Sequence, residues 1–164
     1  MSDKPIPGDK PSSPVCYASE ADDAYMGYAP REELVAALTE LLEAERAGAF
    51  VARVSLRDAP PEMAPLLKSV WRDEARWSAM LIRQLQRLSA RPSTRRGAFA
   101  EKAMAIADPR ERLAFLNRGQ SWVVRKLAEL LPKVRDDTLH AALRDMSESH
   151  ARNIDAAARA MEAG

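Results

Sequence analysis

Apolar residues recur at alternating intervals of three and four positions along four long stretches of the chain. This spacing places them on one face of a helix, as in helices that pack together in a bundle. The first stretch begins near Pro30 and ends near Leu56. The other three run from about residue 61 to 88, from 109 to 131, and from 136 or 137 to 161. The pattern therefore predicts an all-α protein with four long helices.

Prolines mark the breaks between these helices. Pro60 and Pro61 separate the first two, and Pro132 follows the third. The connection between the second and third helices is longer, and residues 97–107 within it predict a short helix. Two helical hairpins joined by a long middle connection are typical of a ferritin-like up-down bundle with one crossover. We therefore expect a four-helix bundle over residues 30–164.

Each long helix carries one polar residue near the middle of its apolar face. These residues are Glu45, Glu74, Gln120 and His150. Burying a carboxylate or an imidazole is costly unless the group is paired, hydrogen-bonded or bound to a metal. One such residue per helix, at matching height, predicts a polar centre inside the bundle.

This arrangement resembles the carboxylate di-metal bundles, in which two helices supply Glu and two supply Glu-x-x-His. Glu45, Glu74 and His150 stand at matching positions. The chain departs from the pattern at three others, where Trp77 replaces His, and Gln120 and Ser147 replace Glu. Two carboxylates and one imidazole do not offset the charge of two divalent ions. The resemblance therefore implies a reduced, mononuclear centre.

Two hypotheses for the centre follow. In the first, Glu45, Glu74 and His150 bind one Fe, Mn or Zn ion, surrounded by Gln120, Trp77 and Ser147. In the second, no metal is bound, Gln120 and the Trp77 indole donate to the carboxylates, and a protonated His150 pairs with one of them. A polar network of this kind can be kept because it sets helix register.

Four sequence blocks carry a wider resemblance. PVCYASEADDAYMGY, REELVAALTELLEAERAGA, WRDEARWSAML and FLNRGQSWVVRKL look like a bacterial family of small ferritin-like proteins of unknown function, over residues 15 to about 160. The bundle is more distantly similar to rubrerythrin, although it lacks a cysteine-rich tail and most di-iron ligands. The resemblance implies a ferritin-like homodimer. The resemblance assigns no activity. If the protein is active, redox chemistry on a small oxidant is the class of reaction that the resemblance implies.

Composition restricts the classes of function and the cellular location that we expect. The 164 residues carry a formal net charge of +1, and this balance argues against a dedicated nucleic-acid binder. Lys and Arg are spread along the helices, which is typical of solvated faces. The single cysteine, Cys16, excludes an intrachain disulfide. We find no long apolar run or signal peptide, so we expect a cytoplasmic protein without a membrane span.

Residues 1–29 form an N-terminal extension in this interpretation. Residues 1–14 hold four prolines and are predicted to be disordered. Residues 15–29 hold all three tyrosines, so this segment is expected to pack across the bundle or onto a partner. The competing functional hypothesis is therefore a metal-free structural or interaction subunit. It would act through this segment and the outer faces of the first two helices.

Overall fold

The computed structural model describes residues 25–162, which form an all-α bundle. The four long helices are α1 (Arg31–Ser55), α2 (Ala64–Arg87), α4 (Pro109–Leu130) and α5 (Asp137–Glu162). The short elements are a 3-10 turn (Pro61–Met63), helix α3 (Phe99–Met104) and a second 3-10 turn (Leu131–Lys133). The predicted four helices and the short connecting helix are confirmed. Predictions for residues 1–24, including Cys16, fall outside the described part of the chain.

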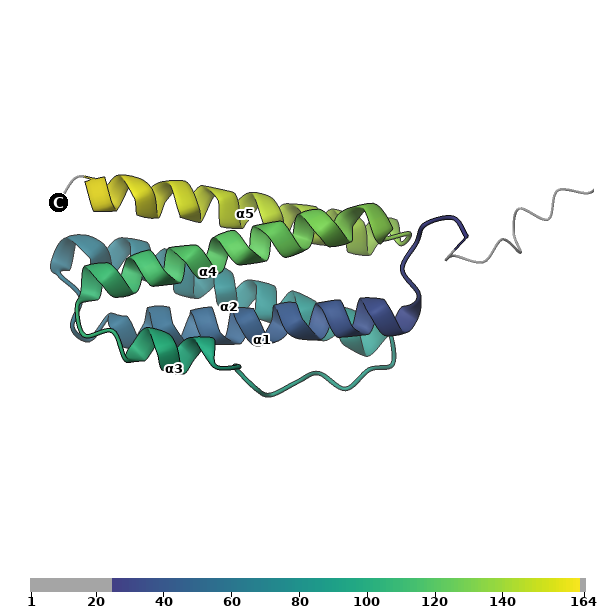
Figure 1. The fold of residues 1–164 in the computed structure, drawn as a ribbon, viewed down its shortest axis with the longest axis horizontal. Helices are drawn as coiled ribbons and strands as arrows, with labels where there is room; N and C mark the ends of the chain where they lie inside the picture. The colour runs from purple at the N-terminus through teal and green to yellow at the C-terminus, as the bar shows by residue number, and fades with distance from the viewer. Residues whose placement is uncertain (1–24, 163–164) are drawn as a thin grey trace, which may run out of the picture.

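The chain path is that of two hairpins joined by a crossover (Figure 1). Helix α1 packs along α2, and α4 packs along α5. The link from α2 to α4 runs back along the length of the bundle and includes α3, so α4 points in the same direction as α2 (Figure 1). Within residues 25–162, every helix is too short or too polar to cross a lipid bilayer.

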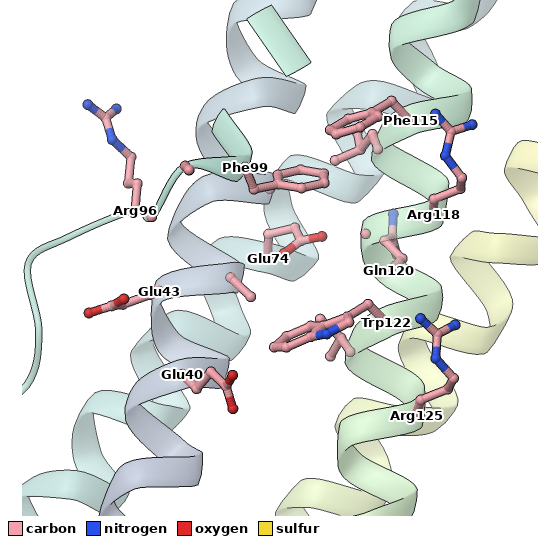
Figure 2. Close-up of a pocket in the computed structure, with 17 residues that line it drawn as sticks. Glu40, Glu43, Glu74, Arg96, Phe99, Phe115, Arg118, Gln120, Trp122 and Arg125 are labelled. Atoms are coloured by element: carbon pink, nitrogen blue, oxygen red, sulfur yellow. The ribbon is translucent and has the colours of Figure 1, made fainter. Parts of the chain in front are cut away.

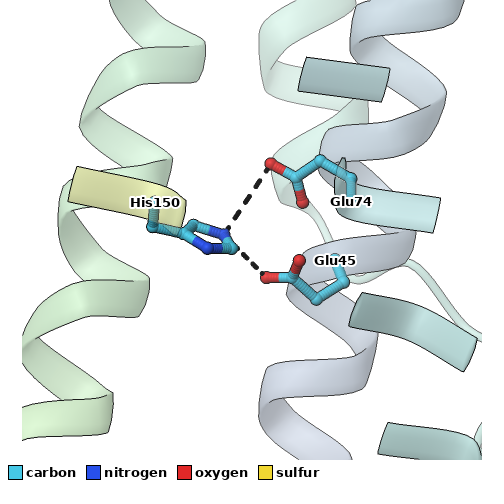
Figure 3. A group of neighbouring side chains, drawn as sticks. All are labelled: Glu45, Glu74 and His150. Atoms are coloured by element: carbon cyan, nitrogen blue, oxygen red, sulfur yellow. Dashed lines mark ion pairs between the residues drawn. The ribbon is translucent and has the colours of Figure 1, made fainter. Parts of the chain in front are cut away.

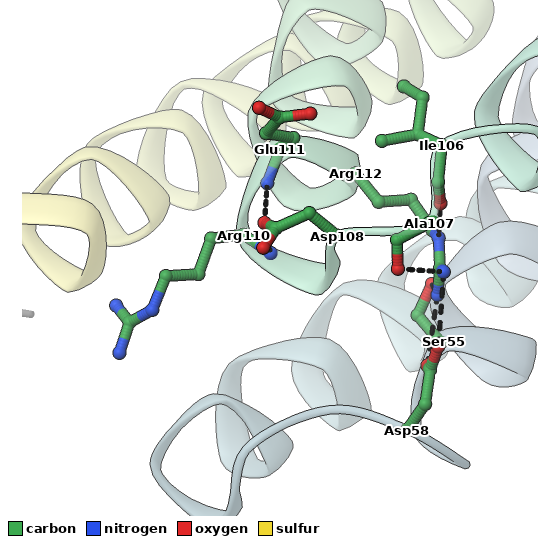
Figure 4. A network of polar contacts seen from close by, with 8 residues as sticks. All are labelled: Ser55, Asp58, Ile106, Ala107, Asp108, Arg110, Glu111 and Arg112. Carbon is green, nitrogen blue, oxygen red and sulfur yellow. Dashed lines mark hydrogen bonds and ion pairs between the residues drawn. The ribbon is translucent and has the colours of Figure 1, made fainter.

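Short polar side chains set where the second hairpin begins and turns. Asp108 Oδ1 accepts hydrogen bonds from the backbone N–H groups of Arg110 and Glu111, at 2.9 and 2.8 Å (Figure 4). These bonds satisfy two of the free N–H groups in the first turn of α4. Asp136 Oδ1 accepts from the backbone N–H of Leu139 at 2.6 Å. Asp136, rather than Asp137, is therefore the N-cap residue of α5.

Arg112 ties together the two links at one end of the bundle. Its guanidinium donates to both carboxylate oxygens of Asp58, at 2.9 and 3.0 Å, and to the backbone carbonyls of Ile106 and Ala107 (Figure 4). A further bond reaches Ser55 Oγ at 3.4 Å. The residue is only 4% exposed. The general expectation that the basic residues lie on solvated faces is wrong here, because this side chain connects segments distant in sequence.

The hydrophobic core is divided into two clusters. One contains Leu38, Leu42, Trp77, Leu81 and Leu143 together with other large apolar residues. The second contains smaller and larger apolar residues nearer the other end, namely Ala47, Val51, Ala52, Met63, Leu67, Val70, Leu113, Leu116 and Ala157. On every long helix, the predicted polar residue lies between members of the two clusters. The bundle therefore contains a polar layer at mid-length.

Candidate metal centre

Glu45 of α1, Glu74 of α2 and His150 of α5 meet in this polar layer (Figure 3). All three are buried, and one ligand atom from each lies within 4.8 Å of the others. His150 Nε2 is 3.1 Å from Glu45 Oε1 and 4.0 Å from Glu74 Oε1. The three residues predicted to bind metal are thus brought together from three different helices.

The orientation of the imidazole is set by the backbone of its own helix. His150 Nδ1 lies 3.0 Å from the carbonyl oxygen of Met146. A carbonyl can only accept, so Nδ1 carries a proton in this contact, and Nε2 faces the two carboxylates, with a lone pair if the ring is neutral or an N–H if it is protonated. A backbone carbonyl that holds one imidazole nitrogen in this way is common in metal-binding histidines. The ring therefore presents an available ligand atom to the two carboxylates.

Acceptor atoms converge at this centre. Within residues 25–162, the Glu45 oxygens and His150 Nε2 have no hydrogen-bond partner if the carboxyl groups are ionised and the imidazole is neutral, despite the 3.1 Å contact between Oε1 and Nε2. Both atoms are then acceptors. The same contact is an ion pair if the ring is protonated, so the paired His150 of the metal-free hypothesis stays a prediction. Buried acceptors that face one another are unfavourable unless a proton or a cation lies between them.

Burial also disfavours the charged form of both carboxyl groups. Burial raises the pKa of Glu45 to about 8, against a smaller lowering by its contact with Glu74. Burial and the neighbouring Glu45 raise the pKa of Glu74 well above its usual range, although His150 acts in the opposite direction. At neutral pH a metal-free centre therefore retains protons. A bound cation would replace them, because metal ligation requires the ionised carboxylates.

Gly48 makes room for the Glu74 side chain. A Cβ atom at this position of α1 would lie 2.7 Å from Glu74 Cδ and Oε2, and 2.8 Å from Oε1. These distances are too short for ordinary contact, so any larger residue would displace the carboxyl group. The close approach of the α1 backbone thus determines where Glu74 can lie.

Gln120 and Trp77 are buried as expected, at 3% and 4% exposure. However, the Trp77 indole nitrogen has no hydrogen-bond partner within residues 25–162, so the hypothesis that it donates to Glu45 or Glu74 is wrong. Its ring packs in the larger hydrophobic cluster, with the Arg76 guanidinium 4.5 Å from the ring centroid. Gln120 Oε1 likewise has no partner among the described residues. Ser147 is half-buried on α5, and its role beside the centre stays a prediction.

The sequence pattern does not predict a second polar contact, which lies beside the centre. Asp73 accepts hydrogen bonds from Ser149 Oγ at 3.3 Å and from Asn153 Nδ2 at 3.1 Å, which joins α2 to α5. Asp73 and Ser149 immediately precede Glu74 and His150, so these bonds help to set the relative height of two of the clustered residues. The sequence signal for this contact is Asn153, a polar residue about one turn after His150 on the same helix.

Comparison with known proteins identifies a family without an assigned function. A family model described as a domain of unknown function (DUF6306) matches residues 32–160, which include Glu45, Glu74 and His150. No curated protein and no solved structure matches the chain. The ferritin-like resemblance therefore stays a prediction.

Proposed function

The chain belongs to the DUF6306 family, and we propose that it binds a single divalent transition-metal ion through Glu45, Glu74 and His150. One observation carries the proposal: three buried ligand atoms face one another within 4.8 Å, and Nε2 of the imidazole points to the carboxylates. A cation bound between these acceptors would offset the cost of burying them.

Charge balance favours one ion. Two ionised carboxylates, one neutral imidazole and one divalent cation give a centre with no net charge, which suits a layer between two hydrophobic clusters. A second divalent ion would leave two uncompensated positive charges. Trp77, Gln120 and Ser147 supply no further anionic ligand, so a dinuclear centre is not supported by these residues.

The donor set also narrows the metal. An imidazole with two carboxylates suits Fe(II), Mn(II) or Zn(II), whereas Mg²⁺ and Ca²⁺ prefer oxygen ligands alone. Three protein ligands leave coordination positions for water or a small molecule. With Fe or Mn, these open positions would permit redox chemistry on a small oxidant. We propose this class of activity within a ferritin-like bundle that has kept half of a di-metal ligand set.

Elemental analysis of the full chain, purified without a metal-affinity tag, tests the proposal. We expect close to one metal per chain, or stoichiometric binding of Mn(II), Fe(II) or Zn(II) by calorimetry. Glu74→Gln and His150→Ala should lose it. Glu148→Gln is the matched control, because this carboxylate lies on α5 near His150 but is exposed and pairs with Arg144. The proposal fails if no metal binds, or if Glu148→Gln has the same effect.

A second candidate function is a metal-free interaction subunit, acting as a homodimer or by docking onto a partner protein. Two large residues beside the undescribed N-terminal part favour it, since Tyr25 and Met26 are 87% and 58% exposed. Trp71 on the outer face of α2 is also partly exposed. Light scattering of the full chain and of a version lacking residues 1–28 tests this function. An unchanged mass and unchanged partner capture would remove its support.

A further inference from the structure

A cavity of about 490 Å³ opens beside the proposed metal centre. It lies between α1, α4 and the segment that contains α3 (Figure 2). Gly48 and Glu74 line its inner end, so the cavity reaches one of the three proposed ligands. Its volume is within the range of small-molecule sites.

The cavity walls are mostly apolar and aromatic. Phe99 and Phe115 stack at a centroid distance of 4.8 Å on one side, and Trp122 lies on the other, with Glu74 in the gap between them (Figure 2). Leu116 and Val123 complete the apolar surface. Such walls favour a ligand with an aromatic or aliphatic body.

Positive charge is in excess at the mouth. Of the acidic residues there, Glu40 pairs with Lys126 at 3.1 Å, and Glu43 accepts hydrogen bonds from Ser93 and Arg95. By contrast, the three exposed arginines that line the cavity have no carboxylate partner among residues 25–162. The Arg96 guanidinium lies 4.0 Å from the centroid of the Phe50 ring. Arg118 and Arg125 are seven positions apart on α4 and therefore on one face of the helix.

The inner end is polar and acidic. Gln120 lines it and is almost fully buried, and its Oε1 has no hydrogen-bond partner in the part of the chain that the structure describes. Glu74 lies beside it. At the mouth a carboxylate would meet the guanidinium groups of Arg118 and Arg125, whereas neither Gln120 nor Glu74 offers it a positive charge at the inner end. The positive charge at the mouth therefore favours an orientation in which the carboxylate of an acidic ligand lies there.

We propose that this cavity binds a small organic acid with an aromatic or aliphatic body. The acid's carboxylate lies at the mouth with Arg118 and Arg125, its body lies between the aromatic walls, and its far end lies next to Gln120 and Glu74. A role for this ligand as substrate or co-ligand rests on the proposed metal function. Its binding to the cavity does not, and can be measured without metal.

The test compares 4-phenylbutyrate with its neutral counterpart, 4-phenylbutan-1-ol, on the full chain in metal-free and zinc-loaded form. Binding is followed by calorimetry and by NMR chemical-shift changes. We expect the acid to bind at least about tenfold more tightly than the alcohol, because hydrogen bonds between charged groups are the stronger ones. The double variant Arg118→Gln/Arg125→Gln should remove this difference.

Two further variants distinguish the effect of the cavity wall from the effect of the arginine charges. Ala44→Leu, on the half-buried cavity wall, should weaken both compounds. Arg152→Gln, an exposed arginine on α5, should weaken neither. Equal binding of acid and alcohol, no binding of either, or an effect of Arg152→Gln equal to that of the double variant would overturn the proposal. Loss of metal binding alone would overturn only the proposed function, since the metal-free measurements would stand.

Discussion

Replacing Gly48 by alanine would test whether the position of Glu74 matters for metal binding. The new Cβ would lie 2.7 Å from Glu74 Cδ, whereas ordinary contacts begin at 3.4 Å. The carboxyl group must therefore move by several tenths of an ångström. Because it is the end of a flexible side chain, it can do so without a large rearrangement of either helix.

The expected energetic effects separate stability from binding. Alanine is better than glycine inside a helix by about 1 kcal/mol, and overpacking costs about 1–3 kcal/mol. These terms oppose each other, so the free energy of unfolding should change little. Displacement of one of three ligands should weaken metal binding by roughly 10–100-fold, as for other changes that misplace a ligand.

Calorimetric titration with Zn(II) and urea unfolding of the metal-free protein would measure the two effects. Gly119→Ala is the matched control, because its Cβ would lie 2.6 Å from the Phe99 ring, without contacting any of the three ligands. It should leave the zinc affinity unchanged. If Gly48→Ala bound zinc as tightly as the unaltered protein, Glu74 could not be a ligand at its present position.

Three further predictions concern pH, the bundle end and the lost ligands. Since burial raises the pKa of Glu45 to about 8, protonation favours the folded metal-free protein. Its stability should fall as pH rises from 5 to 8 in EDTA, and Glu45→Gln should reduce this slope in urea unfolding. Arg112→Lys should cost about 2 kcal/mol at pH 7, because a lysine cannot replace the paired bonds to Asp58. Arg112 lowers the pKa of Asp58, so this difference should shrink as pH falls below the usual aspartate range, and an unchanged difference would contradict the pairing. The triple variant Trp77→His/Gln120→Glu/Ser147→Glu should bind two Mn(II) ions per chain by elemental analysis, and binding of one ion only would argue against a di-metal ancestry.

The sequence alone was sufficient for the helices and for the residues at the polar layer. Apolar spacing is a property of a single helix, so it located all four long helices and placed Glu45, Glu74, Gln120 and His150 on inward faces. Proline marked the breaks between helices, because its effect on the backbone is local.

Only the tertiary structure decided what the polar residues contact. Hydrogen bonding depends on the relative height and rotation of packed helices, which single-helix periodicity does not specify. The fold brought Glu45, Glu74 and His150 together, and it buried Arg112 between distant links. It left the Trp77 indole nitrogen without a hydrogen-bond partner among the described residues. The cavity beside Glu74 exists because the crossover segment lies along α1 and α4, and no local pattern encodes that packing.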